Sequence, residues 1–249
     1  MADRTLEVAE HGDLTALLAD TLITKGSALG DLGRIQEGIG AVETGERLAR
    51  SAGLVSTLMR GLNNRSISQG EIDPAASLAA LDEGLVLARR MGLRYWTFGF
   101  AVGIGYTCFR LGEWDRAVAV LADALADGAA TEDRVLLLDN AVLMPAFRGE
   151  DVSAMLAEMA QLIGDSTDLS LTSNLREARG AEALAAGRLA DAHHEYREAG
   201  VLNTSVSTTD HRSMAAHAAF WAGDSAGARP SSRRSTRPVS EPRLPRRDE

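Results

Sequence analysis

Apolar and small residues recur along the chain at a spacing of three to four residues, the pattern of one face of an α-helix. In one clear stretch, Ala117, Leu121 and Ala124 stand at positions i, i+4 and i+7, which share a helix face. A similar pattern that includes Gly105 precedes them and breaks off at Gly112. This stretch therefore predicts a first helix, a turn at Gly112 and a second helix.

The same helix–turn–helix pattern recurs about six times. Each copy has a small anchor residue near the start of its second helix, and in most copies the anchor follows a turn glycine by five residues. The anchors are Gly38, Ser77, Ala117, Ala154, Ala192 and Ala228. Successive anchors are 39, 40, 37, 38 and 36 residues apart. A period of this length is typical of proteins built from stacked helix pairs.

Glycines stand at matching positions inside the predicted first helices, as Gly26, Gly105 and Gly180. Glycine inside a helix costs about 1 kcal/mol relative to alanine, so its recurrence predicts close packing against the second helix. Two second helices are followed by Gly53 and Gly92. Glycine ends a helix well because it adopts the left-handed conformation at low cost.

These residues resemble the tetratricopeptide repeat, which has small and aromatic or aliphatic residues on its first helix, a turn glycine, and then alanine, aromatic and alanine on its second. The copies around Ala117 and Ala192 match this pattern best, and the copy around Ala154 matches least. The period exceeds the usual value of about 34 residues. It is similar to the longer repeats of bacterial signalling ATPases, adenylate cyclases and related transcriptional regulators. The resemblance implies an all-α fold, a right-handed superhelical α-solenoid of antiparallel helix pairs with about five to six repeats over residues 1–228.

The two ends of the chain differ from the repeats. Residues 229–249 contain seven arginines, three acidic residues and four of the six prolines, a composition that predicts a disordered tail rich in Arg, Pro and Ser. The stretch Leu6–Asp13 resembles the end of a second helix without its first helix, and the last copy breaks off after Ala228. We therefore expect a fragment of a larger protein. Uncapped ends of helical repeats are apolar and favour self-association.

Composition narrows the class of protein. A net charge of −9 argues against nucleic-acid binding by the helical body and leaves the arginine-rich tail as the one candidate contact. The single cysteine, Cys108, excludes an intramolecular disulfide framework and is expected to be an inert core thiol. No stretch approaches the roughly 18 apolar residues of a membrane span, and no signal peptide is visible. We expect a soluble, cytoplasmic protein.

Residues that could carry chemistry do not assemble into a known site. The Trp-Asp dipeptide at Trp114 also occurs in β-propellers, but an alanine-rich helical pattern follows it here, so we expect Trp114 to fill the turn. His193 and His194 are adjacent and point about 100° apart on a helix, so they cannot share one metal ion. The glycines of residues 38–45 lack the Lys-Ser/Thr ending of a phosphate loop. We predict no enzyme, no metal and no cofactor.

A binding surface remains as the predicted functional feature. In stacked helix pairs, first-helix residues that point away from the second helices line the concave face. In this chain they include Asn63, Ile67, Tyr106, Phe109, Arg110 and Glu177. Aromatic residues and arginine are enriched at binding hot spots. For Phe109, packing between neighbouring repeats remains the alternative.

Two functions follow from this surface and from the resemblance. The first is a non-enzymatic helical-repeat scaffold that binds a protein or a peptide. The second, implied by the resemblance, is the sensor or regulatory arm of a larger signalling ATPase, nucleotide cyclase or transcriptional regulator. The catalytic or DNA-binding domain of such a protein would lie outside this chain, and that parent protein would supply the partner domains.

Overall fold

The structure, a computed structural model, is all-α over the residues it describes, which are 2–70, 72–202 and 208–228. The predicted tail at 229–249 lies outside these residues. Twelve helices occupy the described part: α1 (Ala2–His11), α2 (Thr15–Asp31), α3 (Ile35–Ser51), α4 (Val55–Gly70), α5 (Pro74–Arg90), α6 (Arg94–Leu111), α7 (Trp114–Ala126), α8 (Thr131–Phe147), α9 (Ser153–Ile163), α10 (Leu169–Ala185), α11 (Leu189–Leu202) and α12 (Thr208–Trp221). Among the described helices, none is both long and apolar enough to cross a membrane.

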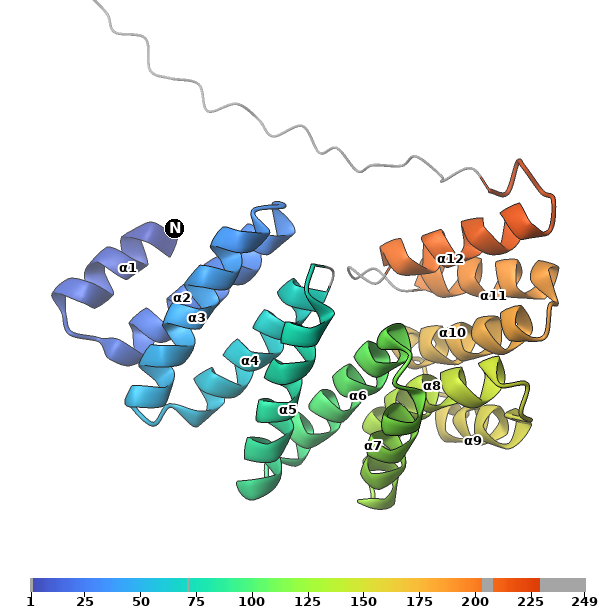
Figure 1. Ribbon diagram of the computed structural model, residues 1–249, viewed down its shortest axis with the longest axis horizontal. Helices are drawn as coiled ribbons and strands as arrows, with labels where there is room; N and C mark the ends of the chain where they lie inside the picture. Colours follow the sequence, from blue (N-terminus) through green and yellow to red (C-terminus); the bar gives the residue numbers. More distant parts are fainter. Residues whose placement is uncertain (1, 71, 203–207, 229–249) are drawn as a thin grey trace, which may run out of the picture.

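The helices follow one another along a curved row, with α1 to α3 at one end and α10 to α12 at the other (Figure 1). The main packing contacts join each helix to the next one, and α2, α4, α6, α8 and α10 also contact each other in sequence. Short turns join most consecutive helices. The chain is therefore organised as successive helix pairs, which we call units: α2/α3, α4/α5, α6/α7, α8/α9 and α10/α11.

The glycines inside the first helices lie where the two helices of a unit approach each other closely, as predicted. A Cβ atom added to Gly26 would lie 2.6 Å from the carbonyl oxygen of Gly38, and one added to Gly45 would lie 2.8 Å from the carbonyl oxygen of Ala19. Earlier residues of α2 thus meet later residues of α3, so the two helices are antiparallel. A Cβ at Gly105 would likewise lie 2.7 Å from the side chain of Leu121. The packing reason inferred for these glycines is confirmed.

The turn between α6 and α7 shows how Trp114 is used. Gly112 has a φ of +77° and ends α6 in the left-handed conformation, which glycine adopts at low cost. The indole Nε1–H of Trp114 donates to the carbonyl oxygen of Phe109 at 3.1 Å, and the two rings stack with centroids 5.8 Å apart. Trp114 therefore fills the joint between the two helices, as predicted.

The apolar core changes character along the row. A large cluster that includes Met59, Phe100 and Ile104 runs through the middle units, and a second one joins α8, α9 and α10. Beyond them, the buried cluster between α10, α11 and α12 consists of alanines and Tyr196. Because burial stabilises by about 25 cal/mol per Å² of apolar area, alanine-rich contacts give the C-terminal end less apolar stabilisation per residue than the middle units have.

Ion pairs between neighbouring units form a regular series, which we call the inter-unit ladder. In each pair the two side chains are 33 or 34 residues apart and lie in consecutive units or in the helix that follows. The pairs are Arg50–Glu83 at 2.5 Å, Asp82–Arg116 at 2.5 Å, Arg89–Asp123 at 3.9 Å, Asp115–Arg148 at 2.6 Å and Glu177–His211 at 2.7 Å. Two of the pairs, Arg50–Glu83 and Arg89–Asp123, join the same positions of successive units, whereas the other three join different parts of neighbouring helices.

Candidate functional site

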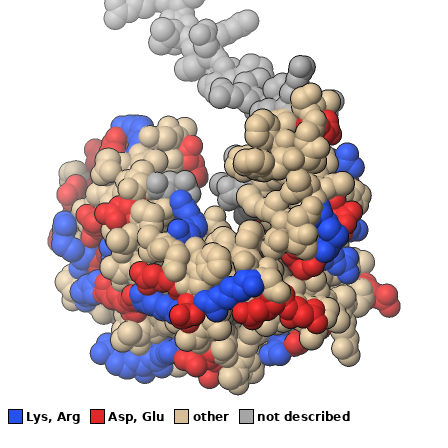
Figure 2. Space-filling view, turned by 45° about the vertical axis from the view of Figure 1, so that its right-hand side comes forward, with Lys and Arg blue, Asp and Glu red and all other residues tan. Residues whose placement is uncertain are grey.

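A space-filling view shows the molecule hollowed between its two ends (Figure 2). Much of the visible surface of this hollow is uncharged, apart from a basic side chain on one wall, and acidic and basic side chains form a band across the face below it (Figure 2). The C-terminal ends of α4 and α6 point toward the space between the two ends of the row (Figure 1). These helix ends contribute most of the residues described next.

A cavity of about 240 Å³ lies between α4, α5 and α6. Four of the six predicted concave-face residues, Asn63, Ile67, Tyr106 and Arg110, line it. The other described lining residues are Ser66, Gly70, Ser77, Leu81, Gly103 and Thr107. The packing of first helix on first helix, α4 on α6, brings together residues that are more than 40 positions apart in the sequence.

The floor of this cavity carries three buried hydroxyl groups, those of Ser66, Ser77 and Thr107. The Ser66 hydroxyl donates to the carbonyl oxygen of Asn63 at 2.7 Å, and the Ser77 hydroxyl donates to the carbonyl oxygen of Ser66 at 2.8 Å. Both hydrogens are therefore used within the protein, while the oxygen lone pairs remain able to accept.

The rim combines apolar surface with one cation. Ile67 is 69% exposed and Tyr106 is 44% exposed. The Arg110 guanidinium donates to the carbonyl oxygen of Gly70 at 3.0 Å and lies 5.9 Å from the centre of the Tyr106 ring. Arg110 is the only charged side chain among the described residues of the lining. The rim therefore presents a fixed cation beside an exposed aromatic ring.

Phe109, also predicted on the concave face, lies apart from this cavity. Its ring stacks on Trp114 and lies 5.5 Å from the ring of Phe147 at the end of α8. Phe109 is thus part of the contact between the α6/α7 unit and α8. The structure favours the packing alternative for this residue.

Glu177 is the second predicted residue that lies elsewhere, in a polar cluster at the C-terminal end of the row. Its carboxylate accepts a hydrogen bond from Nε2 of the buried His211. Asp139 of α8 is buried beside it, and burial, followed by the charge of Glu177, raises the pKa of the Asp139 carboxyl well above its usual value. Burial also raises the pKa of the Tyr196 hydroxyl, helped by the charges of Glu177 and Asp139.

Sequence reasoning missed Asp139 and His211 as members of this cluster. One signal was available, because Asp139 interrupts the apolar run of residues 135–144 in a helix that is otherwise buried. An acid in such a position is rarely buried without a partner. The pairing itself depends on how α8, α10 and α12 stack.

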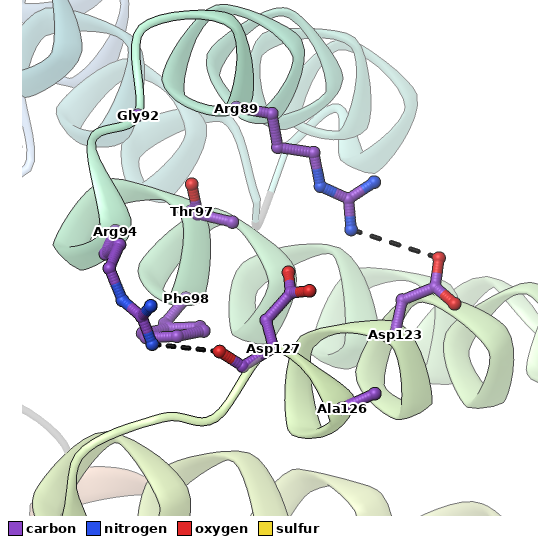
Figure 3. A pocket seen from close by; sticks show the side chains of 8 residues that line it. All are labelled: Arg89, Gly92, Arg94, Thr97, Phe98, Asp123, Ala126 and Asp127. Carbon is purple, nitrogen blue, oxygen red and sulfur yellow. Dashed lines mark hydrogen bonds and ion pairs between the residues drawn. The ribbon is translucent and has the colours of Figure 1, made fainter.

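A larger hollow of about 550 Å³ lies between the ends of α5 and α7 and the start of α6 (Figure 3). Arg89 and Asp123 face each other across it, with 3.9 Å between their charged atoms. Arg94 donates to the carbonyl oxygens of Asp127 and Gly128 at 2.9 and 2.6 Å. Arg94 therefore satisfies carbonyl groups at the C-terminal end of α7, where a cation is favourable. The charged residues that line this hollow therefore stabilise the fold, and we assign the hollow a structural role.

Metal and thiol chemistry have little support in the described part of the chain. Within it, no group of three or more His, Cys, Asp or Glu side chains is placed to hold a metal ion. Cys108 is fully buried, and burial raises the pKa of its thiol. A buried thiol with a raised pKa reacts slowly, because the thiolate is the reactive form.

Comparison with known proteins assigns the chain to no family. No protein-family model matches it, and no curated protein matches it in sequence. Its function is therefore inferred from the cavity between α4 and α6 and from the hollow around it.

Proposed function

We propose that the chain is a non-enzymatic scaffold that binds a segment of a protein or peptide in the hollow between its two ends. The supporting observation is the cavity between α4 and α6, which gathers Asn63, Ile67, Tyr106 and Arg110. Exposed tyrosine and arginine side chains around a concave site are the residues most enriched at binding hot spots. The proposal assigns to this cavity the anchoring of one side chain of the bound segment.

The size of the cavity supports a peptide side chain over a free small molecule. Its volume of about 240 Å³ is below the roughly 300–1,000 Å³ of cavities that enclose drug-sized ligands. A single side chain needs less space, and the rest of its peptide can lie along the hollow. The exposed Ile67 and Tyr106 then supply apolar contact area on either side of the anchor.

We further propose that the units are tetratricopeptide-like repeats stacked as a right-handed solenoid. Three observations support this: the close glycine contacts inside units, the contacts that run from each helix to the next, and the inter-unit ladder. Repeat proteins of this kind bind partners on the extended concave surface that their curvature creates. Peptide binding in the hollow agrees with that use.

Selection of peptides tests the proposed function. Random peptides displayed on phage are selected on the full chain, and enriched sequences are synthesised with a fluorophore and titrated by anisotropy. We expect Tyr106→Ala and Ile67→Ala to weaken their binding at least tenfold, the scale of a hot-spot residue. Tyr95→Ala is the matched control, because Tyr95 is an exposed tyrosine of the same helix that lies outside the cavity lining.

Two results would contradict the proposal. One is the failure of any peptide to bind the folded chain. The other is a set of selected peptides whose affinities change equally with Tyr106→Ala and Tyr95→Ala, since that would place binding outside the cavity.

A further inference from the structure

The chemistry of the cavity between α4 and α6 indicates which side chain it holds. We propose that it takes one tyrosine side chain of the bound segment, with the phenol hydroxyl at the floor and the ring between Ile67 and Leu81. This inference rests on the proposed function, because it names the anchor of the segment that the hollow binds. It adds a specific recognition chemistry to that function.

The floor selects for a hydrogen-bond donor. The hydroxyl hydrogens of Ser66 and Ser77 are donated to carbonyl oxygens inside the protein, so both oxygens can interact with a ligand only as acceptors. The Thr107 hydroxyl has no hydrogen-bond partner among the described residues, although Thr107 is only 7% exposed. A ligand group that donates a hydrogen can bond to these hydroxyl oxygens, whereas an apolar group makes no such bond.

The walls select for an apolar ring. Leu81 is buried at one side of the cavity, where its side chain packs against Gly103, and Ile67 is exposed at the rim. Arg110 places a guanidinium at the same rim, and a guanidinium is attracted to the face of an aromatic ring. An aromatic body with a donor at its tip matches both the walls and the floor.

The same contacts argue against other anchors. A lysine or arginine would bring a second cation next to the Arg110 guanidinium, and like charges repel each other. A glutamate could pair with Arg110, but it has no hydrogen to donate to the Ser66 and Ser77 oxygens, whose own hydrogens are already donated. A phenylalanine would fill the volume but would donate no hydrogen bond to the floor hydroxyls. Tyrosine avoids each of these costs.

Methyl NMR on the full chain tests the inference with defined probes. The methyl groups of Ile67, Leu81 and Thr107 surround the cavity and report directly on its occupation. N-acetyl-L-tyrosinamide, N-acetyl-L-phenylalaninamide and N-acetyl-L-lysinamide are titrated separately. We expect the tyrosine probe to shift these three methyl groups and to bind about five to ten times more tightly than the phenylalanine probe, the effect of one neutral hydrogen bond.

Removal of a floor hydroxyl should erase this preference. Thr107→Val keeps the shape of the side chain, and we expect it to reduce the preference for tyrosine over phenylalanine to about twofold or less. Thr97→Val is the matched control on the same helix. Thr97 is equally buried, but its hydroxyl donates to the carbonyl oxygen of Leu93 and it lies outside this cavity. The preference should survive this control substitution.

The outcomes separate this inference from the proposed function. Equal binding of the tyrosine and phenylalanine probes, or tighter binding of the lysine probe, overturns the tyrosine anchor. Selected peptides that depend on Tyr106 but contain no enriched tyrosine also overturn it, while the peptide-binding function stands. If the tyrosine probe occupies the cavity and no peptide binds, the anchor chemistry holds and the scaffold function fails.

Discussion

The ring of His211 donates a hydrogen bond to the carboxylate of Glu177, 34 residues earlier in the chain, with 2.7 Å between Nε2 and Oε2. His211 is 2% exposed, and its other ring nitrogen, Nδ1, is buried and has no hydrogen-bond partner among the described residues. Glu177 is therefore the polar contact that holds this imidazole in the end of the row. The apolar contacts around it are mainly with alanine, so the loss of one polar partner should lower the stability of this end of the row markedly.

Glu177→Ala should destabilise the protein by about 1–3 kcal/mol, because the buried imidazole then has no hydrogen-bond partner. Urea denaturation of the variant and the wild type measures this change. Asp115→Ala is the control, since Asp115 belongs to another pair of the inter-unit ladder but its side chain is 96% exposed. We expect that variant to have the same free energy of unfolding as the wild type, because exposed ion pairs contribute little to stability. Equal losses in the two variants would contradict the role given to burial.

Asp139→Asn should become increasingly stabilising, relative to the wild type, as the pH rises. The raised pKa of the buried Asp139 carboxyl means that the unfolded chain releases this proton at a lower pH than the folded chain does. Stability is therefore lost as the pH rises from the ordinary aspartate value through the raised value, and the amide has no such loss. Urea unfolding at several values from about pH 4 to about pH 8 measures the difference. A difference that stays constant with pH would indicate a packing effect alone.

Gly26→Ala should destabilise the protein by about 1–3 kcal/mol, the usual cost of forcing a methyl group into a packed interface. The added Cβ would lie 2.6 Å from the carbonyl oxygen of Gly38, and backbone atoms cannot rotate away. Thermal unfolding followed by circular dichroism measures the loss. Gly40→Ala is the control on α3, where an added Cβ meets no atom within 4 Å. That variant should gain about 0.5–1 kcal/mol from the better helix propensity of alanine.

Cys108 should resist modification in the folded protein. The thiol is buried, and its pKa is raised by burial and by neighbouring acidic groups, including Glu113. Reaction with Ellman's reagent at mildly alkaline pH should proceed only as fast as the protein opens, and should be immediate in concentrated guanidinium chloride. Rapid reaction under native conditions would show that α6 opens readily.

Much of the fold could be predicted because glycine leaves a direct signature in the sequence. Gly26 and Gly105 stand where helix backbones meet, and Gly112 ends a helix in a conformation that other residues avoid. These requirements act on single positions, so they repeat with the units. The helical class and the joint at Trp114 followed from the spacing of apolar and small residues around these glycines.

The candidate site could be predicted only in part. Asn63, Ile67, Tyr106 and Arg110 converge because α4 packs directly on α6, a contact that the repeat register implies. The polar cluster could not be foreseen in the same way. Asp139 lies 15 residues before its anchor, as Glu177 does before its own, but the register does not show how deeply each carboxylate is buried. Burial depends on the neighbouring side chains in three dimensions.

The inter-unit ladder has a mechanical consequence. Each of its pairs joins a unit only to its neighbour, so a pull on the two ends of the row would be distributed over many small displacements in series. A structure coupled in this way extends gradually and elastically under force, whereas a globular core with long-range contacts unfolds in one cooperative step. The width of the hollow would then vary with small changes at every contact between units. Dissolved salt screens exposed charges and would therefore lower the stiffness of the row.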